Sequence, residues 1–516
     1  MNKKIILLLS VFIMIMASDC FADNVPSKKP DPSGSNTGTV LDITAAKAGQ
    51  PTLGEVADQV GKNKISINMV WLLMAGFLVF FMQAGFALVE TGFTRAKNVA
   101  HTMAMNLFVY PAGMLAFYVC GFAIMFGGVG SLGTLGSFDG LNHEVGFTIL
   151  GHTFGIIGGK GFFMNGVYDV AILGFFVFQV VFMDAAATIP TGAMAERWKF
   201  ASFAVFGLFV GGIIYPLFGN WVWGGGWLAT LGINFGLGHG HVDFAGSSVV
   251  HLTGGVLAFV GAKMLGARIG KYNKDGSPNA IPGHNIPMAV LGTLVLAFGW
   301  FGFNSGSTLS GTDLRFSVVA FNTMIASCGG AFTATLWMWF VRSDKPDLSM
   351  MCNGLLAGLV AITAPCAFVS PGGALIIGLV AGIIVVEVAF FVEKKLRIDD
   401  PVGAVAVHGA NGIWGCIALG LFADGTYGEG LNGVKGAVAG LFYGDGGQLV
   451  AEILGVATNL IFVGISGWIL FKLLDITIGN RVKPDVELIG LDVPEMGSEG
   501  YMGIKMDRNS ETPLSR

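Results

Sequence analysis

The sequence predicts an all-α polytopic membrane protein with eleven transmembrane helices, and three observations lead to that prediction. Of the 516 residues, 53% are hydrophobic and only 12% are charged, and the mean hydropathy is +0.69, a composition typical of membrane proteins. Apolar stretches near the ~20 residues that cross a bilayer recur along most of the chain. Basic residues gather in alternate connections between these stretches. The net charge of -4 gives no indication of nucleic acid as a partner.

The first 22 residues have the pattern of a secretory signal peptide. Lys3 and Lys4 precede a short apolar run, and Cys20 and Ala22 place small residues where cleavage near Ala22 needs them. The sequence after this point is polar and contains Pro, Ser and Gly, which predicts an external segment. The expected parts of the chain are therefore a signal peptide, an external N-terminal segment, a membrane domain and a cytoplasmic tail, over 1–22, 23–64, 65–476 and 477–516.

Eleven apolar stretches are each expected to form one transmembrane helix. Their bounds are 67–91, 98–126, 171–195, 200–219, 244–267, 285–309, 315–342, 349–369, 371–393, 402–423 and 446–476. An odd number of crossings places the two ends of the mature chain on opposite sides of the membrane.

The distribution of basic residues gives the orientation. The connections after the first, third, fifth, seventh and ninth stretches carry Arg95, Lys97, Arg197, Lys199, Lys263, Arg268, Lys271, Lys274, Arg342, Lys345, Lys394, Lys395 and Arg397. The other connections hold only Lys160, Arg315 and Lys435. Because Lys and Arg are in excess in cytoplasmic loops, we expect the N-terminus outside and the tail inside, in the cytoplasmic (inner) membrane.

One short pattern occurs twice, as "DFAGSSVVH" from Asp243 to His251 and as "DPVGAVAVH" from Asp400 to His408. The fifth predicted helix starts outside and the tenth starts inside, so the two histidines enter from opposite faces. Each lies eight residues after its aspartate, about 12 Å along an α-helix, in a core about 30 Å thick. The pattern therefore predicts an inverted repeat of helices 1–5 and 6–10, with both histidines near the midplane.

Other interpretations of these histidines stay open on the pattern alone. A single histidine in a membrane helix is often a hydrogen-bonding partner between helices, and a pair can ligate haem or a metal. Five cysteines lie outside the predicted signal peptide and show no CxxC pairing, so neither a disulfide framework nor a zinc site is indicated. No cofactor or metal is predicted.

Residues 65–505 resemble the ammonium transporter family (Amt/Mep/Rh), and the chain looks like an Amt-type prokaryotic member. The matching stretches are "FALVETGFTRAKN" (86–98), "FQVVFMDAAATIPTGAMAER" (178–197), "VWGGG" (222–226), "DFAGSSVVH" (243–251), "GWFGFNSGS" (299–307), "GLVAIT" (358–363) and "DDPVGAVAVHGANGIWG" (399–415).

The resemblance implies a homotrimer with one narrow pore through each subunit. It matches His251 and His408 to two pore histidines that share a hydrogen bond, and it assigns external ammonium recruitment to Phe182, Trp223 and Ser307. Phe182 and Phe303 match the stacked pair that closes the external pore entrance. Supporting positions around these residues are Asp243, Asp400, Phe178, Trp300 and Thr363.

The chemistry of these residue types suits ammonium. Aromatic faces attract a cation, and a hydroxyl accepts the hydrogen bonds that ammonium donates and potassium lacks. Asp243 and Asp400 each stand just before a predicted helix, and Pro401 suits the first helical position. We therefore interpret Asp243 as a helix cap that positions His251 rather than as a direct ligand of ammonium.

Several residues fall outside the family pattern. The connection 127–170 and the loop before Asp243 are long, and the second contains His239 and His241, for which metal binding and pH sensing are minor alternatives. Asp184 is an acid within a predicted membrane helix, and its role stays open. Glu90 is interpreted as a structural acid.

The tail "ELIGLDVPEMGSEGYMG" (487–503) resembles the family's cytoplasmic segment, which implies coupling between subunits and a PII-type signalling partner. Met496 stands where a histidine is frequent. The function predicted from the sequence is uptake of ammonium, with net transport of one charge, and no enzyme activity is indicated. The runner-up is a transceptor that senses ammonium with little transport, and a haem-binding redox protein is third.

Overall fold

The computed structural model describes residues 39–501. The predicted signal peptide and the beginning of the predicted external segment lie outside these residues. The chain divides into two compact units, Met1–Asn63 and Lys64–Arg516. In the first unit, the short helix η1 (Val40–Asp42) is closed by a capping box between Thr39 and Asp42.

Long apolar helices make up most of the described chain. Ten are long and apolar enough to cross a membrane, and they comprise α2 (Leu53–Phe93), η2 (Ala96–Asn98) with α3 (Val99–Ala116), η3 (Phe117–Gly121) and α4 (Phe122–Phe126), α5 (Val170–Met194), α6 (Phe200–Phe209) with η6 (Val210–Ile214) and α7 (Tyr215–Trp223), η7 (Ser247–Leu252) with α9 (Thr253–Leu265), α10 (Ile286–Trp300) with η8 (Phe301–Ser305), α11 (Arg315–Trp337) with η9 (Met338–Arg342), α13 (Pro371–Lys394), η10 (Val405–Ala410) with α14 (Asn411–Phe422), and α15 (Gly446–Thr477). The all-α, polytopic prediction is confirmed.

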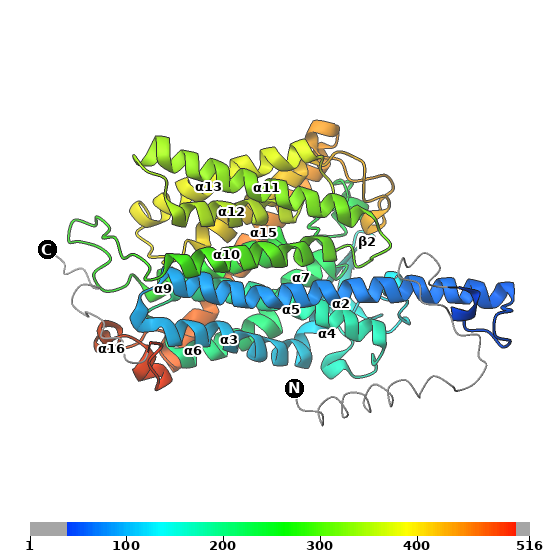
Figure 1. Ribbon diagram of the computed structural model, residues 1–516, viewed down its shortest axis with the longest axis horizontal. Helices are drawn as coiled ribbons and strands as arrows, with labels where there is room; N and C mark the ends of the chain where they lie inside the picture. Colours follow the sequence, from blue (N-terminus) through cyan, green and yellow to red (C-terminus); the bar gives the residue numbers. More distant parts are fainter. Residues whose placement is uncertain (1–38, 502–516) are drawn as a thin grey trace, which may run out of the picture. The chain divides into compact units, whose positions relative to one another are not determined.

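An eleventh apolar helix, α12 (Leu348–Thr363), coincides with the eighth predicted stretch but has only 16 residues. At 1.5 Å per residue it is about 24 Å long, less than the ~30 Å hydrocarbon core. Eleven complete crossings therefore remain a prediction. Helices α10, α11, α12 and α13 run side by side (Figure 1).

The long connection 127–170 contains the only sheet of the described residues. Strands β1 (Glu144–Ile149) and β2 (His152–Gly158) pair in antiparallel fashion. The two residues between them, Leu150 and Gly151, both have positive φ (53° and 84°), the conformation that a tight two-residue hairpin turn requires.

The two helices that carry the predicted pore histidines begin later than the sequence suggests. Their regular part starts at Ser247 and at Val405, where the expected starts were 244 and 402, and Pro401 lies before the helix. Gly246 (φ 120°) and Gly403 (φ 82°) have backbone conformations that end any right-handed helix. Because η7 and η10 are also π-helical, the α-helical rise of 1.5 Å per residue does not give the depth of the histidines.

Helix α9 and segment η10 approach each other closely at two glycines. A Cβ atom on Gly255 would lie 2.3 Å from the backbone nitrogen of Gly409, which follows His408 directly. Glycine at position 255 therefore sets how near the two chain segments come. Small residues at such crossings are a regular feature of membrane helix packing.

Helix α16 (Pro484–Ile489) and segment η13 (Asp492–Met496) of the tail bind to the start of the second membrane span, η2 and α3. Lys97 donates hydrogen bonds to the carbonyl oxygens of Glu487 and Leu488, and the Asp492 carboxylate accepts one from the backbone of His101. The described part of the tail is thus an ordered part of the membrane domain.

A buried ion network joins the connections that follow α2, α5, α9 and α13. Arg268 pairs with both Glu196 and Asp399, and Arg95 pairs with Glu196. Burial alone would raise the pKa of Asp399, but the charges of Arg268 and Arg197 outweigh burial and hold that pKa below its ordinary value. The network fixes the chain just before Asp400.

The Gly255→Ala substitution is expected to lower the thermal stability of the purified protein and to impair its activity, because the added methyl group overlaps the Gly409 backbone. Overpacking of this kind typically costs about 1–3 kcal/mol. Thermal unfolding in detergent measures the effect. Gly207→Ala is the matched control, since its Cβ would have no neighbour closer than 3.8 Å; equal stability of the two variants would contradict the close approach.

Candidate functional site

Two buried histidines meet in the membrane domain. The Nδ1 atoms of His251 and His408 lie 3.2 Å apart, and the residues are 0% and 6% exposed. At this distance one Nδ1 carries the proton and donates it to the other. The structure therefore brings together the two residues that the repeated motif singled out, 157 positions apart in the chain.

Aromatic rings hold His251 in place. Its ring stacks against Trp300 and Phe303, with ring centroids 5.1 and 5.4 Å away. Trp300 donates a hydrogen bond from Nε1 to the Thr363 hydroxyl at 3.0 Å. Trp300 and Thr363, both predicted to support the pore residues, are therefore in contact with each other. Within the described residues, the Nε2 atom of His251 has no hydrogen-bond partner. A buried polar atom without a partner is unfavourable, so Nε2 is the atom at which a polar ligand is expected to bind.

Three phenylalanines form a stack that ends at His251. The centroids of Phe182 and Phe303 are 4.2 Å apart, and those of Phe178 and Phe182 are 4.7 Å apart. Phe182 also contacts Trp223 edge to face at 6.2 Å. The sequence-predicted gate residues are thus in contact, and the three phenylalanines are at most 1% exposed.

A cavity of about 840 Å³ lies on the far side of this stack from the histidines. Its lining includes Trp223, Ser307, Asp243 and Tyr427. Ser307 donates its hydroxyl proton to the carbonyl of Phe303 at 2.8 Å. The hydroxyl oxygen is therefore left as an acceptor facing a cavity that also presents an indole, which is a suitable pair of groups for a hydrogen-bonding cation.

Asp243 caps its helix with both carboxylate oxygens. Oδ1 accepts from the backbone N–H groups of Gly246 and Ser247, and Oδ2 accepts from those of Ser248 and Val249, at 2.7–2.9 Å. The Ser248 hydroxyl donates a fifth hydrogen bond to Oδ2 at 2.7 Å. All the acceptor capacity is directed at the helix start, which supports the interpretation of Asp243 as a cap.

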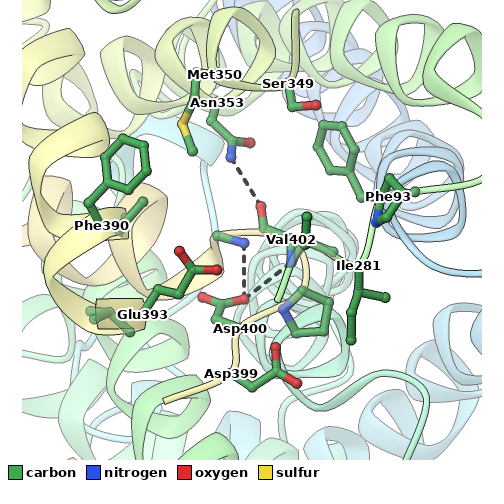
Figure 2. A pocket seen from close by; sticks show the side chains of 18 of the residues that line it. Phe93, Ile281, Ser349, Met350, Asn353, Phe390, Glu393, Asp399, Asp400 and Val402 are labelled. Carbon is green, nitrogen blue, oxygen red and sulfur yellow. Dashed lines mark hydrogen bonds between the residues drawn. The ribbon is translucent and has the colours of Figure 1, made fainter. Parts of the chain in front are cut away.

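Asp400 repeats this geometry (Figure 2). Gly403 donates to its Oδ1 at 3.0 Å and Val405 to its Oδ2 at 2.8 Å, the same third and fifth positions that Gly246 and Ser248 occupy after Asp243. The two motifs thus share these two contacts, while Asp400 lacks the hydroxyl donor and accepts another hydrogen bond from the backbone of Val402.

Asp400 lines a second cavity, of about 310 Å³, together with Asn353 and Val402. A small cavity of about 20 Å³ shares Asn353 and Val402 with it and reaches His408. Figure 2 shows Asn353 donating to the carbonyl of Val402. Asn353 was not singled out in the sequence, where an isolated amide in an apolar helix gave the only signal.

His239 and His241 are buried rather than exposed in a loop. His241 pairs with Glu452 at 2.7 Å and with the Ser248 hydroxyl at 2.8 Å. Burial lowers the pKa of His241, but the adjacent Glu452 outweighs it and raises that pKa. Asp243 and Cys416 lie near enough to complete a metal-ligand cluster, yet both ring nitrogens of His241 are already engaged. Glu452, an acid inside an apolar run, was the signal that sequence analysis missed.

Asp184 makes no hydrogen bond to the predicted pore residues within the described part of the chain. The Asp184 Oδ1 atom has no partner within the described residues, and its backbone carbonyl accepts from Thr188. Asp184 lines none of the three cavities above.

Comparison with known proteins identifies the family. The protein-family model described as "Ammonium Transporter Family" matches residues 70–501 of this chain. The chain belongs to the ammonium transporter family. Ammonium transporter Amt2 of Archaeoglobus fulgidus is 44% identical over 480 residues, which cover 92% of this chain and 96% of that protein. Ammonium transporter Amt1 of Methanocaldococcus jannaschii is 35% identical over 85% of this chain and 98% of its own length.

Solved structures of the family have the same fold. A protein described as "Sensor Amt Protein" has a TM-score of 0.72 and 37% identity, covering 84% of this chain and all of its own. The Mep2 protein of Candida albicans has a TM-score of 0.69 and 26% identity, covering 87% and 93%. The resemblance found in the sequence is confirmed.

We expect substitutions of Asp243 to lower stability and transport in proportion to the number of hydrogen bonds that each substitution removes. Asp243→Ala removes all five hydrogen bonds and should destabilise the helix start by at least about 0.5–2 kcal/mol, displacing His251. Asp243→Asn keeps one acceptor oxygen but turns an amide toward N–H donors, so it should be intermediate. Thermal unfolding and transport by the purified protein test the order. If asparagine and alanine variants are equally inactive while the asparagine variant is as stable as the wild type, the charge itself is required.

Proposed function

We propose that this protein takes up ammonium across the cytoplasmic membrane through a narrow pore that passes the histidine pair. The observation that carries the proposal is the row of contacts from Ser307 and Trp223 through Phe182 and Phe303 to His251, between two polar cavities. Membership of the ammonium transporter family supports it.

The cavity lined by Trp223 and Ser307 recruits the cation in this proposal. Ammonium lies against the indole face and donates a hydrogen bond to the Ser307 hydroxyl. Phe182 forms one side of this site and, with Phe303, closes the path below it. The two rings exclude water, so an ion that passes them loses its hydration.

Loss of hydration disfavours a charged species, and the histidine pair relieves this by taking the proton. Ammonium gives one proton to the free Nε2 atom of His251, and ammonia continues along the path. Because the two Nδ1 atoms share a hydrogen bond, a proton on one ring is coupled to the other. Net transport of one charge follows if this proton travels to the same side as the ammonia.

The remaining features rest on the sequence and the family resemblance. We infer that a signal peptide (1–22) is removed, that the segment 23–64 and the Asp243 side are external, and that the tail (477–516) is cytoplasmic. We also infer a homotrimer. We also infer a PII-type signalling partner for the tail, and the contacts of the tail with Lys97 and His101 support a link from such a partner to the membrane helices.

A transceptor is the alternative function. Likeness to the structure described as "Sensor Amt Protein", 37% identical, favours it, although Ammonium transporter Amt2 of Archaeoglobus fulgidus has the higher identity of 44%.

The decisive experiment measures charge displacement in proteoliposomes after a jump in ammonium concentration. A current that appears with ammonium and stays absent with potassium or sodium establishes selective transport. Specific ammonium binding without current would support the transceptor instead.

Replacing either His251 or His408 by alanine is expected to abolish the ammonium current or to admit potassium. The reason is that a proton accepted by one imidazole ring is coupled to the other ring through the hydrogen bond between the two Nδ1 atoms. The same charge-displacement measurement, with potassium as competitor, tests both single variants. Wild-type current and selectivity in both would exclude the pair from the mechanism.

Ser307→Ala and Trp223→Leu are expected to raise the ammonium concentration of half-saturation more than they lower the maximal current. A cation–π contact contributes about 0.5–2 kcal/mol, which is roughly 2- to 30-fold in affinity. Concentration series of the current provide the measurement, and Val222→Ala, at another position of the same cavity lining, is the control. An unchanged half-saturation in both variants contradicts the recruitment site.

A further inference from the structure

Glu90 lies next to the histidine pair on the side of Asp400. It is 3% exposed near the C-terminal end of α2, and it lines the cavity of about 20 Å³ that also reaches His408. Sequence analysis gave it a structural role. Its place in one cavity with His408, which shares Asn353 and Val402 with the 310 Å³ cavity, suits a second role.

The hydrogen bonds of Glu90 accommodate both an ionised and a protonated carboxyl group. Asn106 donates to Oε2 at 2.7 Å. The Thr191 hydroxyl lies 2.9 and 2.7 Å from the two carboxylate oxygens and 2.6 Å from the carbonyl of Thr188. A hydroxyl has a single proton. When Thr191 donates it to Glu90 the carboxylate is ionised, and when Thr191 donates to Thr188 its oxygen accepts a proton from Glu90.

The surroundings of Glu90 offer little compensation for a permanent negative charge. No Lys, Arg or His is among the hydrogen-bond or ion-pair partners of Glu90 in the described part of the chain. Asp400 is the charged group that acts on it electrostatically, and it is of the same sign. A buried carboxylate without a cation is unfavourable, so a proton arriving nearby has a natural acceptor.

The small cavity is large enough for the carrier that such a transfer needs. A buried water needs about 10–15 Å³, so the cavity of about 20 Å³ that His408 and Glu90 both line has room for one water molecule. Asn353 and Val402 line both this cavity and the larger one, so the route continues beyond Glu90.

We propose that Glu90 receives the proton that ammonium leaves on the histidine pair and passes it toward the cavity beside Asp400. His408, as imidazolium, gives a proton to the bridging water while that water gives one to the Glu90 carboxylate. The products are neutral imidazole and a carboxylic acid, and the acid then releases its proton to water in the larger cavity. No electron is transferred. This inference rests on the proposed function.

Glu90→Gln tests the inference because it keeps size and hydrogen bonding but cannot relay a proton. In proteoliposomes, the ammonium-induced current should fall at least tenfold relative to the wild type. A pH dye inside the vesicles should still report alkalinisation, because neutral ammonia continues to enter. Glu90→Asp keeps the acid and should retain a measurable current.

Asp184→Asn is the matched control, since Asp184 is also a buried acid of a membrane helix but lines none of the cavities; it should carry wild-type current. If Glu90→Gln does not fold, Thr191→Val decides: without the hydroxyl the current should fall severalfold.

Wild-type current in folded Glu90→Gln, or in folded Thr191→Val, overturns the inference alone. Equal loss of current in folded Glu90→Gln and Glu90→Asp also overturns it, because the role is then structural. Wild-type protein without any ammonium current overturns both the proposed function and this inference.

Discussion

The hydrogen bond between the Nδ1 atoms of His251 and His408 is the constraint on which the rest of this structure depends. Two rings on separate helices meet at 3.2 Å only if both helix starts and the spacing between the helices are set closely. Asp243 and Asp400 set the starts through backbone N–H groups at the same relative positions. Gly255 sets the spacing, because a side chain there would push η10 away.

The π-helical segments around the histidines are the second consequence of this constraint. A wider helical turn exposes backbone carbonyls, which must find donors in a medium without water. Asn459 donates to the carbonyl of Ser248, and Asn411 donates to that of Ala406. Each π-helical histidine segment thus has a buried asparagine side chain that donates a hydrogen bond to one of its backbone carbonyls. These hydrogen bonds stabilise the irregular backbone. Loss of such an amide would act on the histidine through its backbone.

Sequence analysis predicted the helices and the histidine pair, and it failed where local structure depends on distant partners. Hydropathy is a local property, so the stretches were found, but the start at Ser247 depends on a positive φ at Gly246 and on the Asp243 carboxylate. The hairpin of Glu144–Ile149 and His152–Gly158 was missed although Val145, Phe147 and Ile149 alternate along its first strand, because that strand is mostly exposed and the second strand does not continue the alternation. The buried pair of His241 and Glu452 joins residues 211 positions apart, which only the tertiary fold brings together.

The proposed path separates ammonium from potassium by what each ion can do once it has lost its water. Both ions are attracted to the indole of Trp223, because cation–π attraction does not distinguish them strongly. Between Phe303 and His251 the neighbouring side chains are aromatic rings, so a permanent charge loses its hydration there and finds only the imidazole nitrogens in its place. Potassium has no proton to give up and stays charged. Ammonium sheds its charge at His251, and from there the molecule that moves is neutral. Selectivity then comes from proton transfer rather than from ion size, so the aromatic stack must be dry for the histidines to discriminate at all.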